Sequence, residues 1–145
     1  MIQATTTATK HIILYAEDDA DDVYMVNLAF AKHKEDIELV HVANGLEAIE
    51  YVNTLSPASK LPCLIILDIN MPIVDGKEAL VHIKNKSFLK DVPVVMFTTS
   101  NSRHDQEFAK KWGADFLTKP LDYKDLEALA GGFSKKCNFE MSKRA

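Results

Sequence analysis

Short apolar runs alternate along the chain with segments whose apolar residues are spaced as on one face of a helix. The last of these segments places Leu126, Leu129, Ala130 and Phe133 at positions i, i+3, i+4 and i+7, the spacing of an amphipathic helix. Strands are expected over residues 12–16, 37–42, 63–67, 94–97 and 114–117. Strands that alternate with helices predict a parallel sheet with helices on both faces.

Polar residues that cap helices stand where several helical segments are expected to begin. Asn44 followed by Glu47 resembles a capping box, and Ser102 and Asp122 are residues that favour an N-cap. Three acidic residues around the start of the first helix are expected only to complement its dipole: Asp19, Asp21 and Asp22.

The predicted fold class is α/β, with a doubly wound five-stranded parallel sheet in the order 2-1-3-4-5, a flavodoxin-like (βα)5 single domain. The length of 145 residues fits one such domain. We expect a flexible N-terminal segment over residues 1–10, the folded domain over 11–134 and a basic tail over 135–145. The tail carries four basic residues and one acidic residue, and we expect it to fray.

Composition excludes several classes of function. Seventeen basic and 21 acidic residues give a net charge of −4, which argues against a nucleic-acid binder that relies on bulk positive charge. The apolar runs are far shorter than the ~20 residues that span a bilayer, so no membrane partner is expected. Cys63 and Cys137 show no metal-binding or redox spacing. Cys63 is interpreted as a small buried apolar residue and Cys137 has no evident role, so we expect a reducing, cytoplasmic location.

Reactive side chains gather where four of the five expected strands end. Glu17 and Asp18 follow the first strand, Asp68 follows the third, Thr98 the fourth and Lys119 the fifth. In the order 2-1-3-4-5 these strands are neighbours, and ligands bind at their carboxyl ends. Three carboxylates at adjacent strand ends repel one another unless a cation lies among them, and their oxygen donors suit Mg²⁺. With a hydroxyl and an ammonium group nearby, the arrangement indicates phosphoryl transfer onto Asp68.

These motifs, in this order, resemble the receiver domain of response regulators in two-component signalling. The resemblance covers residues 11–133. It rests on LYAEDD (14–19), LDINMP (67–72), DG (75–76), VVMFT (94–98) and GADFLTKP (113–120). The run TTS at residues 98–100, with no output domain, is similar to stand-alone regulators that partner phytochrome-like or hybrid histidine kinases.

The resemblance implies a Mg²⁺-dependent phosphoacceptor. Asp68 would receive the phosphoryl group from a sensor histidine kinase or a histidine phosphotransfer protein. Asp18 and Asp68 would bind Mg²⁺ directly, and Asn70 would offer its backbone carbonyl. Glu17 replaces the commoner aspartate, and its longer arm favours binding through water.

The resemblance also implies a conformational switch. Lys119 would pair with Asp68 and then with phosphoryl oxygens, and Thr98 would hydrogen-bond the phosphoryl group. Phe116 would turn inward when Thr98 moves, and a downstream protein would contact the fourth helix, fifth strand and fifth helix. Phe116 lacks the hydroxyl of the tyrosine that is common in the family, so the switch would work through packing alone. The bond between Lys119 and Pro120 would be cis, although sequence alone favours trans.

Other functions stay open. The same acceptor chemistry would serve a phosphorelay intermediate or a phosphate sink, and homodimerisation is undecided. A phosphatase of the haloacid-dehalogenase type also uses an aspartyl nucleophile and Mg²⁺, but it needs an acid where this chain has Asn70. A flavodoxin-like cofactor binder would need a first loop that does not repel phosphate. We therefore expect no enzyme beyond self-catalysed phosphotransfer and dephosphorylation.

Overall fold

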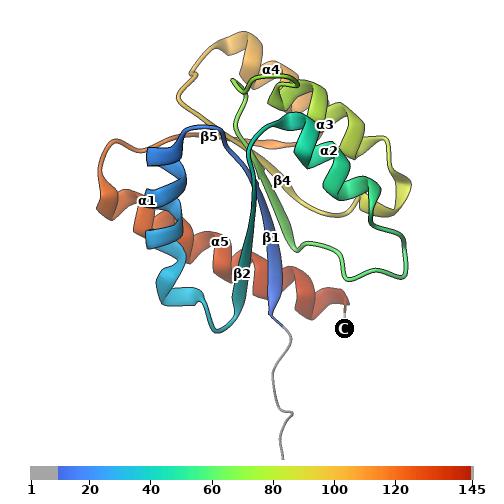
Figure 1. Ribbon diagram of the computed structural model, residues 1–145, viewed down its shortest axis with the longest axis horizontal. Helices are drawn as coiled ribbons and strands as arrows, with labels where there is room; N and C mark the ends of the chain where they lie inside the picture. The colour runs from blue at the N-terminus through green and yellow to red at the C-terminus, as the bar shows by residue number, and fades with distance from the viewer. Residues whose placement is uncertain (1–9, 145) are drawn as a thin grey trace, which may run out of the picture.

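A five-stranded parallel sheet forms the centre of the computed structural model, which describes residues 10–144 (Figure 1). The strands lie in the order β2-β1-β3-β4-β5, so the predicted doubly wound topology is confirmed. They are β1 (His11–Ala16), β2 (Ile37–Val42), β3 (Leu64–Leu67), β4 (Val94–Thr98) and β5 (Asp115–Thr118). Most of the expected N-terminal segment, residues 1–9, lies outside the described residues.

Helices cover both faces of the sheet (Figure 1). One face carries α1 (Ala20–Phe30) and α5 (Tyr123–Arg144), which pack against each other. The other carries α2 (Gly45–Asn53), α3 (Gly76–Lys84) and α4 (Arg103–Lys111). Two short 3-10 helices, η1 (Ala31–His33) and η2 (Ser87–Leu89), lead into the loops that follow α1 and α3. None of the helices described here combines the length and apolarity needed to cross a bilayer.

The predicted caps fix where two of these helices begin. Asn44 accepts the N–H of Glu47 at 2.9 Å, and the Glu47 carboxylate accepts the N–H of Ala43 at 2.8 Å. This reciprocal pair is the predicted capping box. Ser102 accepts the N–H of Asp105 at 3.3 Å and so caps α4.

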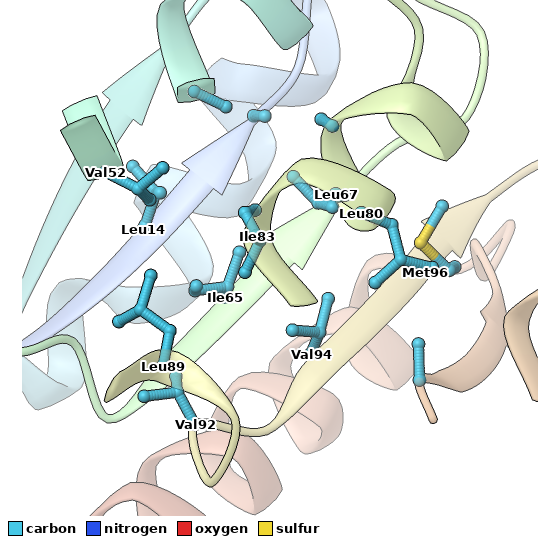
Figure 2. Packing of buried hydrophobic residues seen from close by; sticks show 14 of the residues in the cluster. Leu14, Val52, Ile65, Leu67, Leu80, Ile83, Leu89, Val92, Val94 and Met96 are labelled. Carbon is cyan, nitrogen blue, oxygen red and sulfur yellow. The ribbon is translucent and has the colours of Figure 1, made fainter. Parts of the chain in front are cut away.

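The core consists of two apolar layers, one on each face of the sheet. In β1, Leu14 and Ala16 belong to the layer under α2, α3 and α4, whereas Ile13 and Tyr15 belong to the layer under α1 and α5. Figure 2 shows the first layer, where side chains of β1, β3 and β4 meet those of α2 and α3. All residues of β3 are buried, as expected for a central strand covered on both sides.

The C-terminal residues continue α5. Phe133, Cys137 and Met141 recur at every fourth position, so they lie on one side of the helix and join the apolar layer under α5. This spacing extends the amphipathic pattern beyond the point where the charged residues suggest a tail. The domain boundary expected at residue 134 therefore falls inside a helix, and residues 135–144 are helical.

Cys63 and Cys137 form a disulfide, which corrects the expectation that Cys137 has no role. Cys63 directly precedes β3, and its Cα atom lies 5.1 Å from that of Cys137 in α5. Both residues are fully buried, as expected for Cys63. The two cysteines are 74 positions apart in the sequence, and only the packing of α5 against the sheet brings them together. The pairing could therefore not be predicted from their spacing.

The loop after β3 is packed tightly against the end of that strand. Gly76 begins α3, and its N–H donates to the carbonyl of Ile69 at 2.8 Å. A Cβ atom at this position would lie 1.9 Å from the carbonyl oxygen of Asp68. Asp75 caps α3 by accepting the N–H of Glu78 at 2.9 Å. The loop that follows Asp68 is therefore fixed in place by backbone contacts that only glycine permits.

Substituting Gly76→Ala should lower the free energy of unfolding by about 2 kcal/mol or more, because the new methyl group would overlap backbone that cannot move aside. The matched control is Gly132→Ala in α5, where a Cβ would meet no atom within 4 Å. That control should raise the free energy of unfolding by roughly 0.5–1 kcal/mol, the usual gain in a helix interior. Urea denaturation measures both; equal stability of the two variants would contradict the packing described.

Candidate functional site

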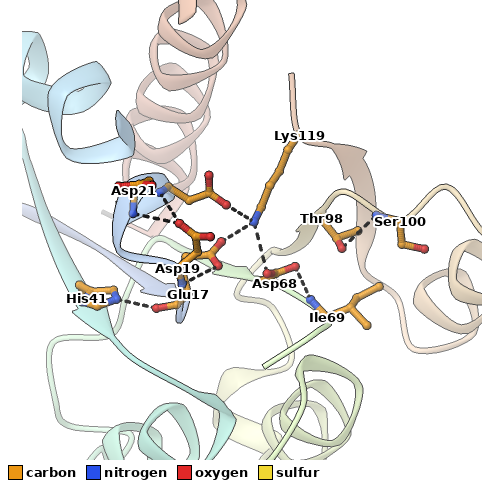
Figure 3. A network of polar contacts seen from close by, with 10 residues as sticks. Glu17, Asp19, Asp21, His41, Asp68, Ile69, Thr98, Ser100 and Lys119 are labelled. Carbon is orange, nitrogen blue, oxygen red and sulfur yellow. Dashed lines mark hydrogen bonds and ion pairs between the residues drawn. The ribbon is translucent and has the colours of Figure 1, made fainter. Parts of the chain in front are cut away.

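Charged side chains from three strand ends meet at the carboxyl edge of the sheet (Figure 3). Lys119 follows β5, and its Nζ atom lies 2.5 Å from Glu17 Oε1, 2.8 Å from Asp22 Oδ2 and 3.2 Å from Asp68 Oδ2. Glu17 follows β1 and Asp68 follows β3, which is paired directly with β1. The structure thus brings together Glu17, Asp68 and Lys119, as the strand ends predicted.

Asp18 joins the same group. One carboxylate oxygen from each of Glu17, Asp18 and Asp68 lies within 4.8 Å of the others. At the usual bond length of Mg²⁺, adjacent ligands stand roughly 3 Å apart and opposite ligands roughly 4 Å apart, so an inward movement of the side chains would let all three share one ion. Every donor is an oxygen, the type that hard divalent cations prefer. The residues present therefore fit a divalent metal.

Backbone and side-chain donors fix the two buried carboxylates. Asp68 Oδ1 accepts the N–H of Ile69 at 2.8 Å, and Glu17 Oε2 accepts the N–H of Asp19 at 3.2 Å. The ring of His41, at the end of β2, donates to the backbone carbonyl of Glu17 at 2.8 Å. Sequence reasoning could not select His41, because its contact is with backbone and not with a reactive group.

The electrostatics of this group depend on burial. Burial raises the pKa of Glu17 to about 7; the charge of Asp68 also raises it, while the hydrogen bond from Lys119 opposes the shift. Burial lowers the pKa of Lys119, but its hydrogen bonds to Asp22 and Glu17 and the charge of Asp68 outweigh burial and raise it above the usual value. Lys119 therefore stays protonated and supplies positive charge among the carboxylates.

Asp22 is a member of the site that sequence reasoning assigned to another role. We expected Asp22 only to complement the dipole of α1, yet its carboxylate is one of the partners of Lys119. Asp22 lies in the first turn of α1, which starts at the same edge of the sheet. The sequence does contain a signal for this position. The helix begins just after Glu17 and Asp18, so a residue in its first turn is expected to lie near these two carboxylates.

An open hollow gives access to this group. Its lining includes Asp18, Asp68, Asn70, Thr99 and Lys119. Asp68 is 7% exposed, so its carboxylate is sheltered and still borders the hollow. A small anionic group could therefore approach Asp68 from solvent and find an ammonium group and metal-binding oxygens beside it.

Thr98 lies at the end of β4 but does not line the hollow. Its side chain is fully buried, and its hydroxyl oxygen accepts the N–H of Ser100 at 3.2 Å (Figure 3). The Ser100 hydroxyl donates to Asp105 of α4 at 2.6 Å, and Lys77 of α3 forms an ion pair with Asp105. Lys77 and then Ser100 lower the pKa of Asp105 below its usual range. The residues after β4 thus connect Thr98 to α3 and α4.

Phe116 occupies the middle of β5, in register with Met96 of β4. Its side chain is half-buried and packs against the apolar layer under α2, α3 and α4. The same layer holds Phe108 and Trp112, whose ring centroids are 6.5 Å apart. Phe116 therefore borders an apolar layer that also contains aromatic side chains.

The peptide bond between Lys119 and Pro120 is trans, since residues 10–144 contain no cis peptide bond. This corrects the cis bond that the family resemblance implied. The trans form is favoured for an X–Pro bond by about 0.5–1 kcal/mol, and Lys119 reaches its carboxylate partners from a trans backbone.

Comparisons with known proteins agree with this geometry. A family model for the response regulator receiver domain matches residues 13–130. The response regulator Rcp1 of Synechocystis sp. is 34% identical over 124 residues, which cover 83% of this chain and 84% of that protein.

Two solved structures share the fold over most of their length. One is the phosphorylated cyanobacterial phytochrome response regulator RcpA, with 29% identity and a TM-score of 0.79 over 88% of this chain and 93% of that one. The other is the Mn²⁺-bound form of Rcp1, with 33% identity and a TM-score of 0.75 over 85% of this chain and 91% of that one.

The match to the family model includes β1 from Ile13 onward, the other four strands, and every strand end that contributes to the charged edge. The chain therefore belongs to the receiver-domain family of response regulators in two-component signalling.

Proposed function

We propose that this protein is a single-domain response regulator whose Asp68 accepts a phosphoryl group from a histidine kinase or histidine phosphotransfer protein. The observation that carries the proposal is the placement of Asp68: it borders an open hollow, pairs with Lys119 at 3.2 Å and lies beside the oxygens of Glu17 and Asp18. We place the protein in the cytoplasm, because phosphohistidine is made from ATP by kinases that act inside the cell.

Mg²⁺ is the metal we propose for this site. Asp18 and Asp68 would hold it directly, Glu17 through water and Asn70 through its backbone carbonyl. When bound, the ion supplies positive charge to the phosphoryl oxygens and to the crowded carboxylates. Lys119 complements it with an ammonium group that already contacts Asp68.

The chemistry of transfer is a simple exchange of bonds. The P–N bond of a phosphohistidine breaks, and a P–O bond forms at the Asp68 carboxylate. The ammonium group of Lys119 can then move from the carboxylate to a phosphoryl oxygen. Asn70 stands where a phosphatase of the haloacid-dehalogenase type needs a general acid, and an amide cannot take that role. The protein is therefore proposed as an acceptor and not as a phosphatase.

The signal would begin at Thr98. Because Thr98 is fully buried and does not line the hollow, its side chain must move before the hydroxyl can donate to a phosphoryl group on Asp68. The movement would disturb the contacts from Ser100 to Asp105 and leave space beside β4 for Phe116. The surface of α4, β5 and α5 would change as a result, through packing alone, and a downstream protein would bind it.

Asp68→Asn should abolish labelling by radioactive acetyl phosphate in the presence of Mg²⁺, because an amide cannot act as the nucleophile. Asp91→Asn, an exposed position in the loop before β4, serves as the control and should be labelled like the wild type. Labelling of the Asp68→Asn variant at the wild-type level would refute the assignment.

Asp18→Asn should weaken Mg²⁺ binding at least about tenfold, since it removes one of three clustered carboxylates. Asp21→Asn removes an equal charge from the adjoining first turn of α1 and should leave the affinity nearly unchanged, because Asp21 lies outside the cluster. Calorimetric titration with Mg²⁺ measures both. If the two variants lose affinity equally, bulk negative charge and not a defined site attracts the ion.

Lys119→Met should have the opposite effect and tighten Mg²⁺ binding about tenfold, because a unit positive charge a few ångströms away repels a divalent ion even in a medium as polar as water. Lys136→Met, at an exposed ion pair with Asp115, is the control and should bind Mg²⁺ like the wild type. Weaker binding by the folded Lys119→Met variant would show that Lys119 does not compete with the metal for these carboxylates.

A further inference from the structure

Cys63 and Cys137 lie at the opposite end of the sheet from the charged edge. Cys63 precedes β3, whereas Asp68 follows the same strand, so the length of β3 separates them. The N–H of Cys63 donates to the carbonyl of Ile12 at 2.8 Å, near the start of β1. Figure 1 shows the C-terminal end of α5 beside this amino end of the sheet.

The last turns of α5 have few other anchors. Among residues 135–144, Cys137 is the one buried residue, and Phe139 is 62% exposed. Arg144 donates to the backbone carbonyl of Pro62 at 3.3 Å, and Lys136 pairs with Asp115 at an exposed position. Surface contacts of this kind contribute little to stability. The position of this part of α5 therefore depends mainly on Cys137 and on the partly buried Met141, which packs against the same apolar layer.

We propose that Cys63 and Cys137 are a site of reversible oxidation, and that their disulfide holds the C-terminal end of α5 against the amino end of the sheet. The Cα separation of 5.1 Å is within the range that a disulfide spans without backbone movement. The bond closes a long stretch of chain, the case in which a disulfide restricts the unfolded state most. This inference does not rest on phosphorylation of Asp68.

The oxidant is a small-molecule disulfide such as oxidised glutathione. One cysteine thiolate attacks it, forming a mixed disulfide and releasing one glutathione thiol. The second cysteine thiolate then attacks the mixed disulfide, forms the Cys63–Cys137 bond and releases the second glutathione. Two protein thiols are oxidised and one glutathione disulfide is reduced, so electrons and protons balance.

Burial determines how this exchange can occur. Neither cysteine is accessible to solvent while α5 is packed against the sheet, since both are fully buried. Cys137 lies in the last turns of α5, seven positions before Arg144, so opening of the helix end exposes it without unfolding the sheet. Oxidation would keep the C-terminal end of α5 packed against the sheet, and reduction would allow it to detach.

The test equilibrates the full-length protein with oxidised or with reduced glutathione and compares the two forms. Because both cysteines are buried, the protein is alkylated in denaturant, and intact mass measurement should then find no free thiol in the oxidised form and two in the reduced form. The oxidised form should melt roughly 10 °C higher. Amide hydrogen exchange of residues 138–144 should be slower in the oxidised form, while exchange in β3 changes far less.

The double variant Cys63→Ala/Cys137→Ala is the control for effects of glutathione itself, and its melting temperature and exchange should not depend on redox state. Two outcomes would overturn the proposal. In one, both thiols of the folded wild type remain free after equilibration with oxidised glutathione. In the other, the disulfide forms but the exchange of residues 138–144 is the same in both redox states.

Discussion

The ammonium group of Lys119, enclosed by carboxylates at the carboxyl edge of the sheet, is the interaction on which the site depends. Glu17 and Asp68 are buried, and buried carboxylates of like charge cannot remain ionised side by side without a compensating cation. Lys119 supplies that cation from a third strand end and contacts both of them. Glu17 and Asp68 also belong to the cluster of carboxylates that fits a divalent metal, so the resting ion pairs and a bound metal would share these two residues.

The two apolar layers explain why this edge keeps its geometry. Strands β1 and β3 are covered on both faces, and their buried side chains leave no room for them to slide. Gly76 lets α3 pack against the backbone of Asp68, so Asp68 is supported by a helix as well as by its strand. Thr98 differs from these residues, because its hydroxyl accepts the Ser100 N–H and Thr98 does not line the hollow. The structure therefore combines a firmly supported Asp68 with a Thr98 hydroxyl that lies outside the hollow.

The sequence could predict the parts of the structure that depend on local pattern. Apolar runs and caps such as Asn44 located the strands and helices, and the residues that follow each strand located Glu17, Asp18, Asp68 and Lys119. Contacts between distant segments could not be predicted in this way. Asp22 and His41 reach the site through helix and strand placement, and Cys63 meets Cys137 only once α5 has crossed the sheet.

The most direct measurement locates the phosphoryl group on the chain itself. After reaction with acetyl phosphate and Mg²⁺, borohydride reduces an aspartyl phosphate to homoserine, and mass spectrometry of the resulting peptides identifies the residue converted. If the carboxylate beside Lys119 is the acceptor, homoserine will be found at position 68 and nowhere else. Homoserine at position 18 or 22, with Asp68 intact, would contradict the account.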